Sequence, residues 1–419
     1  MGGTGGPGDD RPMGDTDEQE QRHRRLTAWQ RSGRVLARMS ADHTLAGRLA
    51  ALAADAGTVH DLGGWTDVYG GGVVAEVERR TAGLLGMEAA AFFPTGTMAQ
   101  QVALRCWAGR TGDPTVALHP LAHPEVHERG ALASVSGLRT VHPTTAPRPA
   151  TADEIRDFPE PFGTLMLELP LRDAGFVLPT WEELRAVVAA ARERDAVVHL
   201  DGARLWECTA HFGRGLPEIA ALADSVYVSF YKSLDGLSGA VLAGPECLVE
   251  EARTWRHRYG GQVFQQYPAA LSALLGLERE LPRLPSYVAH AKLVAGALAE
   301  GLAGSAVPWF RVHPEPPHTH QFQVWLPYAP DVLDEASVRQ AEETGVTLFR
   351  RWFAAPTGPP GLSFTEVTVA APGLEWTAGD VRAAVADFVT RLQEEATRPQ
   401  GEAAPAQEEA ARVEAGPQA

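Results

Sequence analysis

Three short motifs combine residue types that can bind and activate one organic cofactor. Gly96 and Thr97 open a helical pattern, and the N–H groups of such a helix start can bind an anion such as phosphate. Asp201 ends an apolar run, where a carboxylate needs a positive partner. Lys232 follows another apolar run, and a lysine at the edge of a site can form a Schiff base. These groups match the phosphate, the pyridine nitrogen and the aldehyde of pyridoxal 5′-phosphate (PLP).

Each motif also has an ordinary structural interpretation. The turn at Gly96 and Thr97 could be only a helix start, Asp201 could belong to a structural ion pair, and Lys232 could be a surface lysine in a turn. The "YGGG" segment at 69–72 lacks the glycine-rich nucleotide signatures and indicates a loop with a permissive backbone. The occurrence of all three motifs at the ends of strand patterns favours a cofactor site.

The elements that must position these residues alternate between strand and helix patterns. Short apolar runs typical of buried strands are "AAAFFP", "TLMLELP", "AVVHLDG", "DSVYVSF" and "AVLAGP", and helical patterns separate most of them. This alternation predicts an α/β fold with a mainly parallel sheet that is covered on both faces. Ligands of such sheets bind outside the carboxyl ends of the strands, which is where the three motifs stand.

Four stretches of the chain resemble the threonine aldolase / β-eliminating lyase family of PLP-dependent enzymes. These are residues 67–104, 121–131, 199–207 and 224–244, which contain "PTGT", "LAHPEVHERGA", "HLDGAR" and "SFYKSLDG". The resemblance implies the aspartate aminotransferase fold (fold type I), with a large α/β domain around a mainly parallel sheet and a smaller C-terminal α+β domain. It also implies that PLP is the cofactor.

The resemblance implies a role in cofactor binding for each of the three motifs. Lys232 would bind the cofactor covalently as a Schiff base, and Asp201 would pair with the pyridine nitrogen. Gly96 and Thr97 would hold the phosphate. No metal ion is expected in this site.

Two further side chains receive roles from the same resemblance. His123, in a segment that ends at Glu128, would stack on the cofactor ring and act as an acid or base, which suits an imidazole. Arg204 would contact the substrate carboxylate or the cofactor. Arg350 or Arg351 could supply another carboxylate contact, or both could be surface charges.

The sequence departs from the family pattern mainly in segments that would face the substrate. "HDLGGWTDVYG" stands where an "LRSDT"-like segment is usual, and "LPLRDAGFVLP" replaces an Asn-Thr-His-like segment. Tyr231 replaces a small hydroxylic residue before the lysine, and "SLDGLSG" follows in place of "GLGxPxG". "GLSFTEVTV" lacks the arginine that the C-terminal domain of the family supplies.

These observations predict a PLP-dependent carbon–carbon lyase. Its substrate would be a β-hydroxy-α-amino acid, cleaved between Cα and Cβ to glycine and an aldehyde as by threonine aldolase. A β-elimination or another PLP-dependent amino-acid transformation is the nearest alternative, and a non-catalytic binding protein with this fold is a further one. Since fold type I enzymes commonly share sites between subunits, we expect a homodimer or homotetramer in which Tyr69 or Tyr259 reaches a neighbouring site.

Composition narrows the class of protein and its compartment. The 419-residue chain has 44% hydrophobic residues and a formal net charge of −16, which argues against a nucleic-acid or anionic-membrane surface. The three cysteines show no paired spacing, and no signal peptide or membrane-spanning run is apparent, so we expect a cytoplasmic protein.

The chain divides into four predicted segments. Residues 1–24 and 394–419 have the composition of disordered tails. Residues 25–284 are predicted to form an N-terminal segment and the PLP-binding domain, and residues 285–393 the small C-terminal domain.

Overall fold

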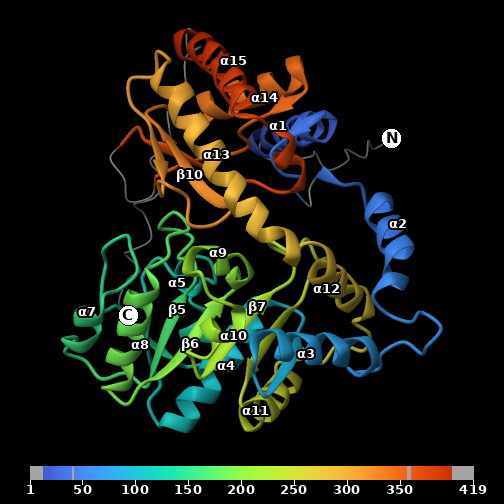
Figure 1. Ribbon diagram of the computed structural model, residues 1–419, viewed down its shortest axis with the longest axis vertical. Coiled ribbons are helices and arrows are strands. Elements are labelled where there is room, and N and C mark those ends of the chain that lie inside the picture. The colour runs from blue at the N-terminus through green and yellow to red at the C-terminus, as the bar shows by residue number, and fades with distance from the viewer. Residues whose placement is uncertain (1–12, 40–41, 356–359, 399–419) are drawn as a thin grey trace, which may run out of the picture.

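The computed structural model describes residues 13–39, 42–355 and 360–398. The described chain forms a large lobe around a seven-stranded sheet and a small lobe around a four-stranded sheet (Figure 1). The terminal segments 1–12 and 399–419, which were predicted to be disordered, lie outside the described residues.

The large sheet has the strand order β2-β8-β7-β6-β5-β3-β4. Its strands are parallel except for β8, which runs antiparallel to both β2 and β7. The predicted mainly parallel sheet and fold class are therefore confirmed. The strands are β2 (Ala89–Phe93), β3 (Thr115–Ala117), β4 (Arg139–Val141), β5 (Thr164–Glu168), β6 (Val197–Gly202), β7 (Ser225–Ser229) and β8 (Ala240–Gly244).

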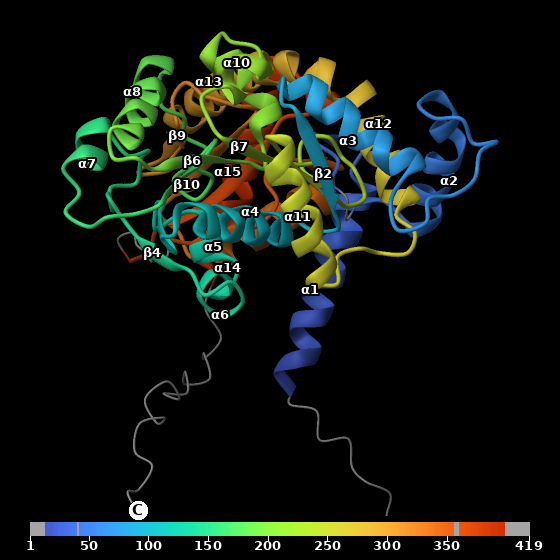
Figure 2. The same ribbon diagram turned by 90° about the horizontal axis from the view of Figure 1, so that it is seen from below.

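Helices cover both faces of the large sheet (Figure 2). One apolar core joins one face to α3, α8, α10 and α12, and a second core joins the other face to α4 and α11. This double burial is why the strands are nearly continuous apolar runs. The helices are α3 (Gly72–Leu85), α4 (Gly96–Thr111), α8 (Trp181–Arg192), α10 (Leu216–Ala220), α11 (Glu246–Arg258) and α12 (Tyr267–Arg279).

Three neighbouring parallel strands bring the chemically important residues to one edge of the large sheet. Glu168 at the end of β5 lies opposite Asp201 on β6, and Asp201 lies opposite Tyr227 on β7. Since β5, β6 and β7 run in the same direction, their carboxyl ends meet at one edge. The chain leaves β7 at this edge and reaches Lys232 three residues after Ser229.

The small lobe contains an antiparallel sheet of order β12-β13-β10-β9. A separate apolar core holds this sheet against α13, α14 and α15. The long helix α13 joins both lobes, because Leu284 and Tyr287 belong to the core of the large lobe while Ala291 and Leu302 belong to that of the small one. The elements are β9 (Arg311–His313), β10 (Gln321–Leu326), β12 (Trp352–Ala354), β13 (Ser363–Thr368), α13 (Leu284–Ala303), α14 (Pro330–Thr344) and α15 (Ala378–Thr397).

The N-terminal segment differs from its prediction. Residues 1–24 were predicted to be a disordered tail, and the segment from residue 25 was predicted to accompany the large domain. From Met13 onward it forms α1 (Met13–Arg31) and β1 (Arg34–Val35), and β1 pairs with β11 (Val346–Thr347) beside the small lobe. Arg24 forms ion pairs with Glu335 at 2.8 Å and Glu342 at 2.7 Å. The charged composition of this segment predicted disorder. The prediction was wrong because the partners of Arg24 lie far along the chain, where a local pattern cannot reveal them.

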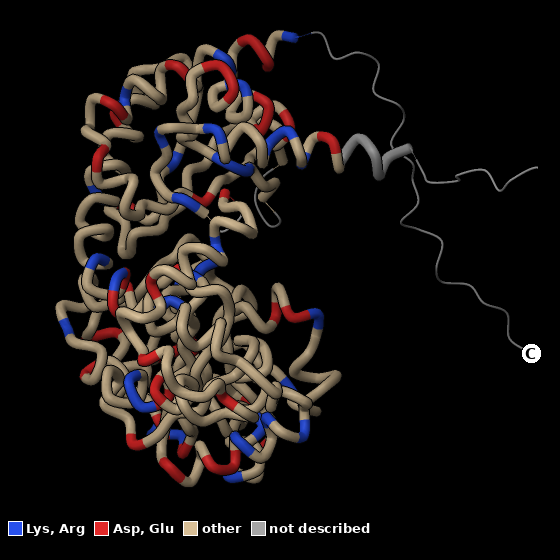
Figure 3. Tube along the Cα trace, turned by 90° about the vertical axis from the view of Figure 1, so that its right-hand side faces the viewer, with Lys and Arg blue, Asp and Glu red and all other residues tan. Residues whose placement is uncertain are grey.

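The remaining elements connect those already named. None of the helices within the described ranges is both long and apolar enough to cross a membrane. In the view of Figure 3, basic and acidic residues are interspersed along the described chain in both lobes. The remaining helices are α2 (Leu45–Asp55), α5 (His123–Val126), α6 (Ala131–Ser134), α7 (Ala152–Arg156) and α9 (Thr209–Phe212), with 3-10 turns η2 (Ala56–Thr58), η3 (Leu205–Glu207), η4 (Leu281–Arg283) and η5 (Ala371–Glu375).

Candidate active site

The N-terminus of α4 forms one side of the site. Thr95 caps the helix by accepting a hydrogen bond from the Met98 N–H at 3.2 Å. Helix geometry leaves the N–H groups of Gly96 and Thr97 without intrahelical acceptors. Gly96 is required sterically, because a Cβ atom there would overlap the hydroxyl of Tyr227 and lie 2.8 Å from its Cζ. The helix start at Gly96 is therefore present, and the binding of a phosphate by the N–H groups of Gly96 and Thr97 stays a prediction.

Asp201 lies almost fully buried on β6, with 2% of its surface exposed. Its Oδ1 accepts a hydrogen bond from the Ala203 N–H at 3.1 Å. Burial raises the pKa of Asp201, and the nearby Lys232 ammonium opposes that rise. A carboxylate in this position is stabilised by a cation placed against it, which the protonated nitrogen of a pyridine ring would supply.

Lys232 stands in the loop that joins β7 to β8. The turn is closed by hydrogen bonds from the Asp235 N–H to the Lys232 carbonyl (3.1 Å) and from the Gly236 N–H to the Phe230 carbonyl (2.8 Å). Burial lowers the pKa of Lys232 to about 8, and the Arg204 guanidinium contributes to this shift. The amine is therefore more often uncharged, and more nucleophilic, than an ordinary lysine at neutral pH.

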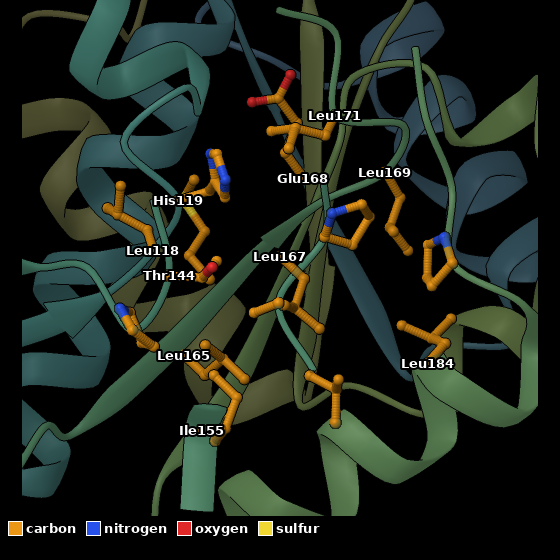
Figure 4. A pocket seen from close by; sticks show the side chains of 16 residues that line it. Leu118, His119, Thr144, Ile155, Leu165, Leu167, Glu168, Leu169, Leu171 and Leu184 are labelled. Atoms are coloured by element: carbon orange, nitrogen blue, oxygen red, sulfur yellow. The ribbon is translucent and has the colours of Figure 1, made fainter. Parts of the chain in front are cut away.

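Glu168 is a further charged residue at this sheet edge. Its carboxylate accepts hydrogen bonds from the backbone N–H groups of His123 (2.7 Å) and Arg172 (3.2 Å). Burial and then the charge of Asp201 raise the pKa of Glu168 to about 7. An apolar cavity of about 40 Å³ lies beside β5, with Glu168 at one end and Leu165 and other apolar side chains along it (Figure 4).

The carboxylate of Glu128 orients the imidazole of His123. His123 Nδ1 lies 3.3 Å from Glu128 Oε1, and Glu128 Oε2 accepts a hydrogen bond from Gln101 at 3.2 Å. Ser136 donates to Gln101 Oε1 at 2.6 Å, so the buried carboxylate is itself held in place. With Nδ1 directed at Glu128, Nε2 has no hydrogen-bond partner among the described residues. This arrangement orients one ring nitrogen for proton transfer.

Two arginines lie close enough to Lys232 to lower its pKa, namely Arg204 and Arg172. Each has a buried Nε–H group without a hydrogen-bond partner. The Arg204 guanidinium lies over the Phe176 ring at 5.3 Å, and Arg172 forms an ion pair with Glu366 of β13 at 3.0 Å. Arg172 is therefore already paired, whereas Arg204 forms no ion pair among the described residues and is the freer cation for an anionic ligand beside Lys232.

The other arginines considered from the sequence lie elsewhere. Arg350 donates to Asp42 (2.8 Å) and to the Ala37 carbonyl (3.0 Å), and Arg351 lies over the Phe353 ring. Neither contacts a residue of this site among the described hydrogen bonds and ring contacts. The roles predicted for His123, Arg204 and the cofactor-binding residues stay predictions.

The residues present fit PLP by their chemistry. The donors at the N-terminus of α4 suit a phosphate, the buried Asp201 carboxylate suits a ring cation, and the Lys232 amine suits an aldehyde. The buried, unpartnered Nε–H of Arg204 is a further donor toward an anionic group. Together they would hold the cofactor at the carboxyl edge of β5, β6 and β7.

The lowered pKa of Lys232 predicts how cofactor uptake depends on pH. Only the uncharged amine attacks an aldehyde, so its fraction falls tenfold for each pH unit below a pKa of about 8. We expect the rate of PLP uptake by the apoprotein to rise through neutral pH and level off above about pH 8. Stopped-flow absorbance measures this rate, and a small alkylamine with PLP corrects for the titration of PLP itself. A rate that still rises tenfold per unit above about pH 9 would contradict the prediction.

Sequence reasoning missed three residues near the predicted ones. Glu168 ends a strand at the same edge as Asp201, so the strand-end rule that found Asp201 could have found it. Tyr227 is an ordinary strand residue in sequence, and only the packing puts its hydroxyl against Gly96. His127 was not among the predicted site residues, and its ring lies 5.1 Å from that of His123 while it hydrogen-bonds Asp173 at 2.7 Å.

The family model and the similar sequences agree on one family. Residues 62–312 match the family described as beta-eliminating lyase. Low-specificity L-threonine aldolase 1 of Arabidopsis thaliana is 28% identical over 287 residues, which are 65% of this chain and 77% of that protein. The low specificity L-threonine aldolase of Escherichia coli K12 is 31% identical over 241 residues, covering 56% of this chain and 72% of that one.

Solved structures extend the similarity over both lobes. A structure described as a putative L-allo-threonine aldolase from Listeria monocytogenes is 33% identical, with a TM-score of 0.79 over 88% of this chain and 99% of that chain. Serine palmitoyltransferase of Sphingomonas wittichii is 17% identical, with a TM-score of 0.59 over 84% of this chain and 85% of that one, and it shares the fold alone.

Proposed function

This chain belongs to the beta-eliminating lyase family and is a PLP-dependent lyase, and from that premise we propose that it cleaves β-hydroxy-α-amino acids between Cα and Cβ. The products would be glycine and an aldehyde. The observation that carries this proposal is the pair of His123 and Glu128, a base oriented by a carboxylate next to the strand end of Glu168. Cleavage of this bond requires such a base for the β-hydroxyl proton.

His123 performs the proton transfer in this proposal. Its Nε2 takes the proton of the substrate β-hydroxyl, directly or through a water molecule, as the Cα–Cβ bond breaks and the β-carbon leaves as an aldehyde. Glu128 holds Nδ1 at 3.3 Å and stabilises the imidazolium that forms. Bound PLP supplies an electron sink for the charge left at Cα. A proton then returns to Cα, which yields glycine.

The other residues bind and orient. Lys232 would hold the cofactor through its aldehyde until the substrate amine takes that place, and the released Lys232 amine would then serve proton transfer at Cα. Asp201 would pair with the pyridine nitrogen and keep it protonated, which would make the ring a stronger electron acceptor. Arg204 and Arg172 provide cations for the α-carboxylate of the substrate, and this contact selects amino acids over simple amines.

The test is a product assay on the purified holoprotein. L-threonine, L-allo-threonine and D-threonine are supplied separately, and acetaldehyde and glycine are measured together. Equal amounts of both products from at least one substrate are expected. Pyruvate and ammonia from serine or an aromatic amino acid, without glycine, would favour β-elimination instead. Binding of PLP with no product from any of these amino acids would favour a non-catalytic protein.

An exposed apolar patch supports a homo-oligomer in which a second copy of the chain covers one side of this site. Trp65 is 100% exposed, and Tyr69 and Phe264 meet edge to face at 5.3 Å while each stays more than half exposed. Asp67 anchors the patch by accepting hydrogen bonds from the Gln266 and Tyr267 N–H groups. Exposed aromatic clusters of this kind mark protein interfaces.

Replacing Trp65 or Phe264 by aspartate is expected to convert the assembly to monomers, because a charge in an apolar interface core is desolvated without a partner. Light scattering coupled to size-exclusion chromatography measures the mass. Trp309 is the matched control, since it is 43% exposed but lies in the small lobe away from the patch. An unchanged mass in both patch variants, or a monomeric wild-type protein, would remove the proposed interface.

A further inference from the structure

A cluster of three polar side chains adjoins the predicted cofactor lysine, and two of the three are fully buried while the serine is partly buried. Glu207 ends the 3-10 turn η3, Ser233 follows Lys232 in the loop after β7, and His320 precedes β10 of the small sheet. The Ser233 hydroxyl donates to Glu207 Oε2. His320 Nε2 lies 3.2 Å from the same oxygen and 3.3 Å from Ser233 Oγ.

The cluster is enclosed and internally charged. The side chains of His320 and Glu207 are 3% and 0% exposed. Burial alone would lower the pKa of His320, but the Glu207 charge and hydrogen bond raise it above its ordinary value. The imidazolium is therefore the stable partner of the buried carboxylate, and His320 Nδ1 is directed to the Val369 carbonyl at 2.7 Å. A buried charge pair of this kind has one well-defined geometry.

The three members come from segments that the site also uses. Glu207 follows Asp201 and Arg204 on the same stretch of chain, and Ser233 is covalently next to Lys232. His320 belongs to the small lobe, where the backbones of His320 and Val369 are joined by a 3.0 Å hydrogen bond. Hydrogen bonds within the cluster thus join the chain segment that carries Lys232, the segment that follows Asp201 and the small lobe.

We propose that Glu207, His320 and Ser233 form a positioning cluster that holds Lys232 in its reactive orientation and ties that orientation to the small lobe. The three residues are positioning residues and need no contact with the cofactor or substrate. The inference rests on the role proposed for Lys232 as the cofactor lysine. The proposal gives a function to Ser233, the residue directly after the lysine, through the hydrogen bond of its hydroxyl to Glu207.

If Ser233 only stabilised the loop after β7, removing any anchor of that loop would have the same effect. A second serine that anchors the same loop therefore distinguishes a positioning role from a merely structural one. Ser272 Oγ accepts a hydrogen bond from the Leu237 N–H at 2.9 Å, so it holds the same loop at its far end. Ser233→Ala and Ser272→Ala each remove one hydroxyl that anchors this loop. Only the first removes an anchor next to Lys232.

The experiment uses the holoprotein and measures how fast hydroxylamine removes PLP from Lys232, followed by the loss of visible absorbance. A hydrogen bond to a charged group is worth about a tenfold change in an equilibrium. We expect removal to be about tenfold faster in Ser233→Ala and within about twofold of wild type in Ser272→Ala. His320→Leu should also speed the removal of PLP. His320→Gln keeps a donor for Glu207, so its removal rate should return most of the way to that of the wild type.

The outcomes separate this inference from the proposed function. Equal rates in the two serine variants, or no rescue by His320→Gln relative to His320→Leu, would overturn the positioning cluster while leaving the role of Lys232 intact. A wild-type protein with no lysine-bound PLP would overturn the role of Lys232 itself. If His320→Leu does not fold, the two serine variants still decide the question.

Discussion

Replacing Lys232 by alanine is expected to remove covalently bound PLP and to lower the rate of substrate cleavage by about 10⁴-fold or more. The variant loses both the amine that bonds to the cofactor and the nearest amine for proton transfer. Lys232→Arg should be equally inactive, because a guanidinium keeps the charge but cannot attack an aldehyde at neutral pH. Visible absorbance and the rate of glycine formation measure the two effects.

The chain offers one matched control for this prediction. It contains only two lysines, Lys232 and Lys292, so reduction of the holoprotein with borohydride can label only these two side chains. Lys292 is exposed on α13, and Lys292→Ala should keep the absorbance and the activity of the wild type. Label on Lys292, or activity that survives Lys232→Ala, would exclude Lys232 as the cofactor lysine.

Replacing Asp201 by asparagine is expected to lower kcat by about 10²–10³-fold, the effect of removing one well-placed electrostatic stabiliser. Asparagine keeps the shape and can still accept the 3.1 Å hydrogen bond from the Ala203 N–H. It carries no charge to hold the pyridine nitrogen in its protonated form, so the ring becomes a poorer electron acceptor. PLP should remain bound through Lys232, which visible absorbance can verify in the same sample.

Asp224 provides the matched control for this substitution. Its carboxylate accepts a hydrogen bond from the Val198 N–H at 2.8 Å at the opposite end of the same strands. Asp224→Asn makes the same change in charge within the large sheet but away from the site, and kcat should change less than about twofold. A similar loss of kcat in both variants would show that the loss comes from a disturbed sheet and not from the removal of a partner of the pyridine nitrogen.

The fold and the cofactor were predictable because they depend on local patterns. Strands buried on both faces must be apolar along their whole length, and helices must alternate with them to cover the sheet. Asp201 interrupts this pattern at the end of β6, and a buried carboxylate that forms no ion pair among the described residues is unusual enough to indicate a ligand. The N-terminal segment was mispredicted for the complementary reason that Arg24 depends on Glu335 and Glu342, which are distant in sequence.

The sequence by itself determined the fold class and the cofactor, through its apolar strand patterns, the residue types at the ends of those strands and the family resemblance of four segments. It also predicted the residues that would bind the cofactor. The tertiary structure alone decided which distant side chains surround Lys232. It brought Arg172 and its partner Glu366 to the site, and it closed Ser233 against Glu207 and His320. The physical reason is that a buried charge is tolerated only beside its partner, and no local pattern in the sequence identifies a partner on another strand or in the other lobe.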